Sequence, residues 1–224
     1  MKTCIVTGAS GNLGQAVIKK FLDEGYSVVG TVIENDPVPL NMNNPNFNKQ
    51  VLDLTNEKSV EDFIGQLKEL NVAVLTVGGF AMGKIVDTRL ADVKKQVALN
   101  FETAYAIARP VFLKMLEAKE GRIFLIGSKP GLNSRYAKGM VAYSLAKSLI
   151  FRLAELMNDE AKGTNVVTSV IVPSTIDTPE NRKSMPDADP NKWVKAEEIA
   201  SAIYYYSTEG KVIREPVIKT YNNS

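Results

Sequence analysis

Residues 2–14 read Lys-Thr-Cys-Ile-Val-Thr-Gly-Ala-Ser-Gly-Asn-Leu-Gly. The apolar run that ends at Thr7 is short and stops at a glycine, which is typical of a strand buried in a parallel sheet. Gly8, Gly11 and Gly14 then lead into a helical pattern of apolar residues. Glycines in such a turn let the backbone approach a phosphate group, and the helix N-terminus that follows favours an anion. The segment therefore predicts a strand, a phosphate-binding turn and a helix, with a tight turn that binds no ligand as the alternative.

Strand-like and helix-like patterns alternate along the rest of the chain. Strands are predicted at residues 2–7, 26–33, 51–54, 72–77, 122–126, 166–172 and 216–221. Helices are predicted at residues 13–24, 59–70, 92–119, 141–158 and 197–206, and Pro110 should bend the third of them. Polar segments rich in Asn or Pro, at 35–48 and 173–192, are predicted as loops. This order predicts an α/β fold over residues 1–224: a single doubly wound domain with a parallel sheet of about seven strands and helices on both faces.

The composition of the chain indicates which partners are not expected and in which cellular compartment the protein is expected. The chain has 224 residues with 27 basic and 25 acidic side chains, and this near balance gives no reason to expect nucleic acid or a membrane surface as partner. No apolar run approaches the roughly 20 residues of a membrane span, and no signal peptide is visible. Cys4 is the one cysteine and lies in an apolar strand, so we expect it to be buried and the protein to be cytoplasmic.

The chain contains no histidine. This excludes Ser-His-Asp and Cys-His catalysis and nearly all histidine-based metal sites, so no metal is predicted. Any proton transfer must use a tyrosine, a lysine, a carboxyl group or water.

One pair of residues fits that requirement. Tyr143 and Lys147 lie four residues apart in Tyr-Ser-Leu-Ala-Lys and share one face of the predicted helix. A phenol has a pKa of about 10 in water, and an ammonium about 4 Å away lowers it by up to about three pKa units. Such a phenol donates and recovers a proton near neutral pH. The alternative is an ordinary amphipathic helix with an interfacial tyrosine and a solvated lysine.

The glycine turn and the Tyr143–Lys147 pair together resemble the short-chain dehydrogenase/reductase family, and the resemblance covers almost the whole chain. It implies a Rossmann-type domain that binds NAD(P)H and reduces the carbonyl of a small molecule, with Tyr143 as proton donor. Lys147 is implied to lower the pKa of the phenol and to hold the nicotinamide ribose. Members of the family are often homodimers or homotetramers formed through their two long helices. The apolar residues of these helices fit either an interface or the core, for example Ile107, Val111, Leu149 and Leu153.

The resemblance implies two further catalytic residues. Ser128 would donate a hydrogen bond to the substrate oxygen; it lies further from Tyr143 than the family commonly has, so Ser134 is kept as the alternative. Asn100 matches a helical asparagine whose backbone carbonyl holds a water in the proton relay. A buried asparagine in a helix is unfavourable unless it is hydrogen-bonded, which also indicates a role.

The resemblance also implies a set of cofactor-binding residues after the strands. They are Gly8, Ser10, Gly11, Asn12, Leu13, Gly14, Thr31, Asp53, Leu54, Gly78, Gly79, Tyr143, Lys147, Pro173, Ile176 and Thr178. Thr31 stands at the end of the second strand, where a carboxylate favours NAD and an arginine favours NADP. Threonine is neither, so the choice between NAD and NADP stays open.

The segment at about 174–195 is predicted to be a substrate loop, and its part at 177–193 resembles the corresponding loop of dihydropteridine reductases within this family. Those enzymes carry an alanine where Ser128 stands, so the serine favours reduction of a carbonyl. Met185 and Trp193 would form apolar walls and Arg182 would meet an anionic group. The alternative is that Arg182, Lys183 and Trp193 only fix the loop to the domain. Two rivals stay open: a pterin reductase, and a binding protein that senses NAD(P) without turnover.

Overall fold

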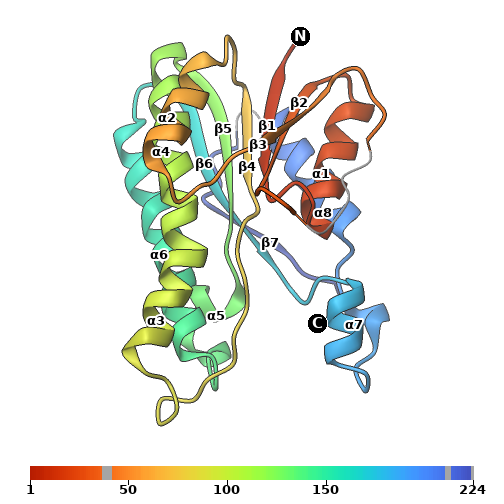
Figure 1. Cartoon of the computed structure of the whole chain (residues 1–224), viewed down its shortest axis with the longest axis vertical. Coiled ribbons are helices and arrows are strands. Elements are labelled where there is room, and N and C mark those ends of the chain that lie inside the picture. The colour runs from red at the N-terminus through yellow and green to blue at the C-terminus, as the bar shows by residue number, and fades with distance from the viewer. Residues whose placement is uncertain (37–41, 210–212, 223–224) are drawn as a thin grey trace.

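The computed structural model describes residues 1–36, 42–209 and 213–222. Its strands form one parallel sheet with the order β3-β2-β1-β4-β5-β6-β7 (Figure 1). They are β1 (Thr3–Thr7), β2 (Ser27–Val32), β3 (Phe47–Val51), β4 (Val72–Leu75), β5 (Glu120–Ile126), β6 (Asn165–Pro173) and β7 (Val217–Thr220). The strand order reverses between β1 and β4, and such a reversal opens a crevice at the carboxyl ends of the strands. The predicted parallel α/β sheet is confirmed.

Helices cover both faces of this sheet, as predicted (Figure 1). They are α1 (Asn12–Asp23), α2 (Glu57–Gln66), α3 (Leu90–Val97), α4 (Thr103–Ala118), α5 (Lys129–Leu132), α6 (Val141–Glu160), α7 (Pro179–Ser184) and α8 (Ala196–Ser207). α1 and α8 pack against each other on one face, whereas α2, α4 and α6 cover the other. No helix in the described part of the chain is long and apolar enough to cross a bilayer.

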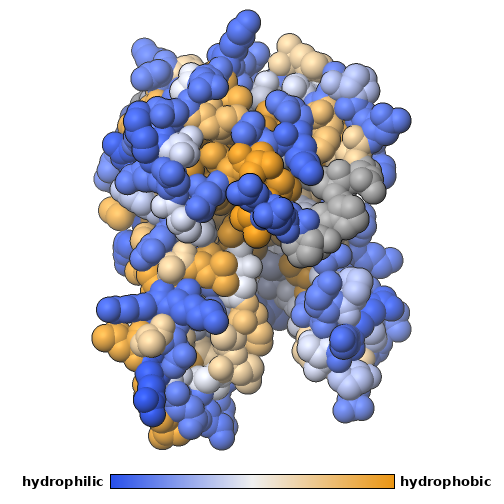
Figure 2. All heavy atoms as spheres, viewed as in Figure 1, coloured by the Kyte–Doolittle hydropathy of each residue, from blue (hydrophilic) through white to orange (hydrophobic). Residues whose placement is uncertain are grey.

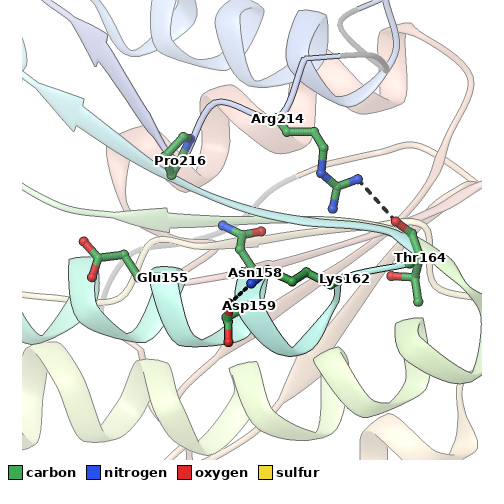
Figure 3. A pocket seen from close by; sticks show the side chains of 8 residues that line it. Glu155, Asn158, Asp159, Lys162, Thr164, Arg214 and Pro216 are labelled. Carbon is green, nitrogen blue, oxygen red and sulfur yellow. Dashed lines mark hydrogen bonds and ion pairs between the residues drawn. The ribbon is translucent and has the colours of Figure 1, made fainter.

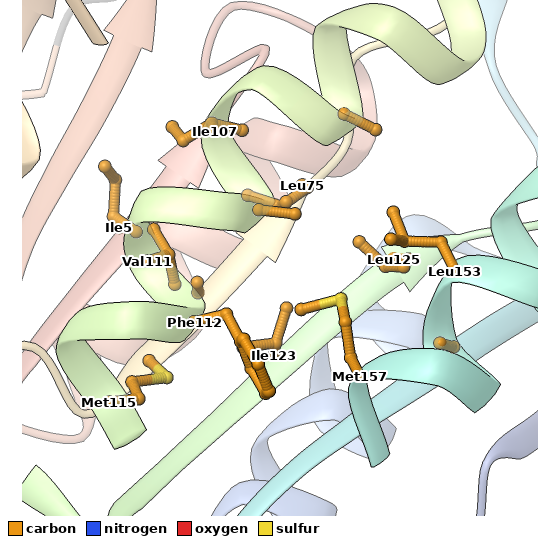
Figure 4. Close-up of a cluster of buried hydrophobic side chains, with 14 of the residues drawn as sticks. Ile5, Leu75, Ile107, Val111, Phe112, Met115, Ile123, Leu125, Leu153 and Met157 are labelled. Carbon is orange, nitrogen blue, oxygen red and sulfur yellow. The ribbon is translucent and has the colours of Figure 1, made fainter. Parts of the chain in front are cut away.

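The larger apolar core fills the layer between the sheet and the helices α4 and α6 (Figure 4). Every third or fourth residue of α4 enters it, including Ile107, Val111 and Met115, which are fully buried. A buried aliphatic side chain of this size contributes about 1.5–3 kcal/mol. Cys4 lies in the smaller core on the opposite face, buried as predicted, and burial raises the pKa of its thiol.

Two element boundaries were predicted wrongly. β3 lies at Phe47–Val51 and not at 51–54, because this edge strand is polar and only partly buried and so lacks the apolar run used to find it. The apolar Leu52 and Leu54 are buried after the strand has ended. α2 ends at Gln66, four residues before the prediction, since Leu67 turns the backbone to an extended conformation.

The predicted helix 92–119 is interrupted before Pro110 and not at it. α3 and α4 are joined by a π-helical segment, Ala98–Glu102, in which the Thr103 N–H donates to the Ala98 carbonyl. α4 then continues through Pro110 to Ala118 without interruption. A π-turn inside an α-helix is frequent at functional sites, and this one carries Asn100.

Two short helices were not predicted: α7 lies within the polar segment 173–192, which was predicted as a loop, and α5 lies between the predicted strand 122–126 and the predicted helix 141–158. Ser128 caps α5 and Thr178 caps α7, each by accepting a hydrogen bond from the backbone N–H three residues later. A proline stands in the first turn of both helices, where its missing N–H costs nothing. The polar composition of these segments masked the start signals.

Candidate active site

Residues predicted for catalysis and residues predicted for cofactor binding lie together near the carboxyl ends of the strands. Gly78 and Gly79 follow β4, Ser128 follows β5, and Tyr143 and Lys147 lie in the first two turns of α6. The glycine turn after β1 lies at the same edge of the sheet, where the strand order reverses between β1 and β4.

The glycine turn is shaped for a phosphate group. Gly8 has φ +62°, and a methyl group at Gly14 would lie 2.2 Å from the carbonyl oxygen of Gly8, so neither position accepts a side chain without movement. Gly11 occupies the N-cap position of α1, and because it has no side chain it cannot accept a capping hydrogen bond from the helix. The first turn of α1 also has no acidic residue. The backbone N–H groups at the start of α1 are therefore available to an anion.

Two carboxylates contact side chains of this turn. The Ser10 hydroxyl donates to Asp36 Oδ2 at 2.6 Å, and Asn12 Nδ2 donates to Glu180 Oε2 at 3.1 Å. The second contact joins α1 to α7 across a long stretch of sequence. Neither partner was found from the sequence, because each depends on how a distant segment folds back.

Asn100 holds the backbone of Gly79. Its Oδ1 accepts from the Gly79 N–H at 3.1 Å, and its Nδ2 donates to the Gly79 carbonyl at 3.0 Å and to Gln96 Oε1 at 3.0 Å. This pairing explains how a buried amide is accommodated in a helix. The resemblance assigned a role to the backbone carbonyl of Asn100, whereas the structure shows a role for its side chain.

Lys147 is a buried cation near the same glycines. Its side chain is 5% exposed, and Nζ donates to the Ile126 carbonyl at 2.8 Å. A methyl group at Gly78 would lie 3.1 Å from Nζ and 2.7 Å from Asn100 Oδ1, so this glycine leaves room for both polar groups. Burial lowers the pKa of Lys147 to about 8. The ammonium form therefore still predominates at pH 7.

Tyr143 makes a hydrogen bond with Ser128. Burial raises the pKa of the phenol, and the bond with Ser128 opposes that increase. The prediction that Lys147 lowers this pKa is wrong for the protein as described, because the effect of burial dominates and Lys147 donates to Ile126 instead. A raised pKa keeps the phenol protonated at neutral pH, which is the state that a proton donor requires.

The two candidate serines lie in different surroundings. Ser128 is buried and bonded to Tyr143, whereas Ser134 lies exposed in a short 3₁₀ helix, Ser134–Tyr136. The Ser128 hydroxyl also accepts a hydrogen bond from the Gly131 N–H at 3.2 Å, which fixes its oxygen. Ser128 therefore has the geometry expected of the catalytic serine.

Phe80 was not assigned a role from the sequence, yet it lies against Tyr143. The two rings meet edge to face with centroids 5.0 Å apart, and Phe80 is 60% exposed. Other exposed apolar side chains follow: Met82, Ile85 and Val86 on the same loop, and Leu90 at the start of α3. Figure 2 shows hydrophobic side chains at the lower left, near α3 and the loop before it, and a hollow between this part and α7. The loop is fixed to the start of α6, since Gly83 exchanges backbone hydrogen bonds with Gly139 and Val141.

The other predicted cofactor residues lie in two parts of the chain: Thr31, Asp53 and Leu54 on β2 and after β3, and Pro173, Ile176 and Thr178 at the end of β6 and after it. Thr31 and Leu54 are buried. The carboxylate of Asp53 accepts hydrogen bonds from the backbone N–H and the hydroxyl of Thr55, and these bonds lower the pKa of that carboxyl. Pro173, Ile176 and Thr178 follow one another at the carboxyl end of β6. The hydroxyl of Thr178 accepts from the Asn181 N–H at 3.1 Å as the cap of α7.

The predicted substrate loop is fixed at several points. Arg182 makes two hydrogen bonds to Asp177, at 2.6 and 2.8 Å, and Trp193 is buried. These contacts favour the interpretation that Arg182 and Trp193 fix the loop to the domain. Met185 is 37% exposed and is the one of the three that keeps an open apolar surface.

A second hollow, of about 600 Å³, lies at the opposite edge of the sheet, between the end of α6 and the start of β6 (Figure 3). Its charged groups are already paired. Lys162 forms an ion pair with Asp159, and Arg214 donates to the carbonyls of Thr164 and Val166. These pairs join α6, β6 and the segment before β7, so we interpret the hollow as part of the packing between these elements and not as a reaction site.

The pH dependence of stability should reveal Lys147. Between pH 8 and 10.5 the unfolded chain binds more protons at this lysine than the folded protein, so its contribution to the free energy of unfolding rises with pH, by on the order of 3 kcal/mol. Below pH 8 the cost of burying the ammonium is fully present. Urea denaturation of the parent and of Lys147→Met between pH 7 and 10 measures this as a difference in the free energy of unfolding that shifts in favour of the parent as the pH rises.

Tyr143 and Cys4 have raised pKa values, which reduce stability at high pH and so oppose the effect of Lys147. Both residues are present in the parent and in the variant, so their effects cancel when one free energy of unfolding is subtracted from the other. A difference that stays constant over this range would contradict a lowered pKa for Lys147.

Comparisons with known proteins give the family and the fold of the chain. The family model described as short chain dehydrogenase matches residues 2–189. Dihydropteridine reductase of Dictyostelium discoideum is 28% identical over 214 residues, covering 92% of this chain and 88% of that protein. Acetoacetyl-CoA reductase of Acinetobacter sp. (strain RA3849) is 26% identical and covers 80% of this chain and 75% of its own length. The solved structure of ElxO with NADP bound has a TM-score of 0.88 at 20% identity, covers 97% of this chain and 96% of its own, and shares the fold.

Proposed function

Since the chain belongs to the short chain dehydrogenase family, we propose that it is an NAD(P)-dependent oxidoreductase that reduces the carbonyl of a small molecule. The observation that carries this proposal is the hydrogen bond between Tyr143 and Ser128, with the buried cation of Lys147 one helical turn along α6. A protonated phenol and a hydroxyl that meet at one point are the groups that a reduced carbonyl oxygen needs.

The residues present fit a nicotinamide dinucleotide. The glycine turn and the uncapped start of α1 would hold its pyrophosphate, and the surface beside Gly78 and Lys147 would hold the nicotinamide ribose. Pro173, Ile176 and Thr178 follow β6 on the same edge of the sheet. When bound, the cofactor supplies the hydride that reduces the substrate.

Each of the four catalytic residues has a distinct task in this proposal. Ser128 orients the carbonyl oxygen by donating a hydrogen bond, and Tyr143 gives the proton that this oxygen needs. Lys147 supplies a positive charge near the phenol and the ribose. Asn100 holds Gly79, and so keeps the end of β4 open beside both.

The substrate would lie between Phe80 and the loop that carries α7. The exposed ring of Phe80 and the apolar loop after it indicate a substrate with an apolar or planar part next to its carbonyl. A pterin reductase is the second candidate, and the 28% identity to dihydropteridine reductase supports it.

Replacing Ser128 with alanine separates the two candidates. Loss of a positioned donor to a developing oxyanion costs roughly 100-fold in rate, so ketone reduction by Ser128→Ala should fall by about that factor. Reduction of a quinonoid dihydropterin should change only a few-fold. Oxidation of NADH and NADPH, measured with a panel of ketones and with the pterin, gives both numbers for parent and variant; Ser134→Ala is the matched control.

Pterin turnover without ketone turnover in the parent would replace the carbonyl proposal with the pterin candidate. If neither class of substrate oxidises bound cofactor, while the protein binds a partner according to the cofactor's redox state, the non-catalytic sensor replaces both.

The protein is also proposed to be a homodimer or homotetramer. Ile107, Val111 and Leu153 are buried in the core, so they cannot form the interface, but the outer faces of α4 and α6 expose other apolar side chains. These are Tyr105, Leu113, Leu145, Leu149 and Leu156. Sedimentation velocity measures the assembly directly. The cytoplasmic location and the absence of nucleic-acid and membrane partners stay predictions from the composition.

A further inference from the structure

Two residues that follow β7, Tyr221 and Asn222, contact two segments that lie far apart in the sequence. β7 pairs with β6 in parallel, and the Ser174 N–H donates to the Thr220 carbonyl at 3.1 Å, so the pairing continues to the end of both strands. The chain therefore leaves the sheet at the carboxyl ends of its strands, where the predicted substrate loop also begins.

Asn222 holds the returning arm of that loop. Its Nδ2 donates to the carbonyl of Asn191 at 3.1 Å and to the carbonyl of Trp193 at 3.0 Å. One nitrogen serves both carbonyls because a side-chain amide carries two N–H donors. The two acceptors belong to a short 3₁₀ helix, Pro190–Lys192, and to the residue that ends it.

The same arm closes the loop onto the end of β6. The Val194 N–H donates to the Thr175 carbonyl at 3.0 Å, and the Asp177 N–H donates to the Val194 carbonyl at 2.9 Å. Trp193 stands directly before this pairing and is only 6% exposed. Asn222 therefore fixes the arm next to the point where the loop leaves the domain and returns to it.

Tyr221 contacts the other side of the site. Nζ of Lys129 lies 4.2 Å from the centroid of the Tyr221 ring, within the distance at which an aromatic face attracts a cation. Lys129 is the first residue of α5 and directly follows Ser128, which makes a hydrogen bond with Tyr143. The ring therefore packs on the neighbour of the proposed catalytic serine.

We propose that Tyr221 and Asn222 are positioning residues of the substrate site, which together hold the substrate loop in place relative to the segment that carries Ser128. The inference rests on the proposed function, in which the substrate lies against that loop. Neither residue takes part in the chemistry, since Asn222 acts through the loop and Tyr221 acts through Lys129. Loss of either contact should weaken the binding of the substrate more than it slows the chemical step.

Trp193 gives a measurement that does not depend on turnover, because it is the only tryptophan of the chain. Asn222→Asp keeps the shape of the side chain and replaces its donors with an acceptor, which the two carbonyls repel. The arm should then open locally, so the emission of Trp193 should move to longer wavelength and acrylamide should quench it more strongly. Asn191→Ala is the matched control, since it keeps the backbone carbonyl that accepts from Asn222 and should retain the parental fluorescence.

Steady-state kinetics with a substrate that the parent reduces test the consequence for the site. In Asn222→Asp the KM for that substrate should rise by about three- to tenfold, the usual effect of losing one or two hydrogen bonds. kcat and the affinity for ADP-ribose should stay within about twofold of the parent. Both side chains are exposed, so the urea midpoint should hardly change. A residue that only stabilised the fold would lower the active fraction, and hence kcat, at an unchanged KM.

Tyr221 allows a second matched pair. Tyr221→Leu removes the aromatic face and should raise KM in the same way, whereas Tyr221→Phe keeps that face and should retain the parental KM.

Unchanged fluorescence of Trp193 in Asn222→Asp overturns the inference. So does a parental KM in both Asn222→Asp and Tyr221→Leu when the parent reduces a substrate, and in that case the proposed function stands without it. If the fluorescence of Trp193 changes in Asn222→Asp but the parent reduces neither a carbonyl nor a pterin, the positioning of the loop is supported and only the proposed function fails.

Discussion

Tyr143→Phe should lower kcat by roughly 100- to 10,000-fold, which is the usual contribution of a positioned general acid. The variant keeps the ring that packs edge to face on Phe80 and loses only the hydroxyl that bonds to Ser128. The affinity for the cofactor should stay within a few-fold of the parent, because the glycine turn and Lys147 are untouched. Steady-state kinetics combined with calorimetry of the cofactor measures both quantities.

Tyr136→Phe provides the control. Tyr136 is an exposed tyrosine in the nearby 3₁₀ helix, and loss of its hydroxyl should change kcat by less than about twofold. Retention of parental turnover in Tyr143→Phe would remove the central claim of the proposed mechanism, whatever the other variants show.

Gly14→Ala should destabilise the protein by about 1–3 kcal/mol or more and weaken cofactor binding at least about tenfold. The new methyl group would lie 2.2 Å from the carbonyl oxygen of Gly8 and 3.1 Å from the α-carbon of Ala9, both of them backbone atoms. The glycine turn must therefore open to admit the methyl group, and its N–H groups lose their common direction. Urea denaturation measures the first effect and calorimetry the second.

Gly65 offers an unusually direct comparison, because it also lies in a helix and a methyl group there would meet nothing within 4 Å. Gly65→Ala should stabilise the protein by about 0.5–1 kcal/mol through helix propensity alone. If the two variants shifted the free energy of unfolding equally and in the same direction, the tight approach at Gly14 would have no energetic consequence.

The sequence was sufficient for features that depend on local pattern. The run before Thr7, the glycines after it and the helical stripe that follows predict β1, the turn and α1, because each is set by neighbours in the chain. The four-residue spacing of Tyr143 and Lys147 places both on one helix face for the same reason. The alternation of elements predicted the parallel sheet.

Features that depend on distant contacts could not be predicted in this way. The bonds of Ser10 to Asp36 and of Asn12 to Glu180 require the chain to return to the turn, which no local pattern encodes. The pKa values of Tyr143 and Lys147 are set by burial, so a calculation from the charge of the neighbouring residue alone missed the direction for the phenol. β3 was misplaced because an exposed edge strand need not be apolar.

The π-turn at Ala98–Glu102 constrains how the length of this gene product can change. Each residue of an α-helix advances the chain by about 100° around the axis, so deletion of one residue there would turn α3 by roughly that angle relative to α4. α3 packs on α6, and Asn100 reaches Gly79 from within the turn, so both alignments would be lost together. Insertions and deletions should therefore be rejected at this point, although nothing in its composition marks it.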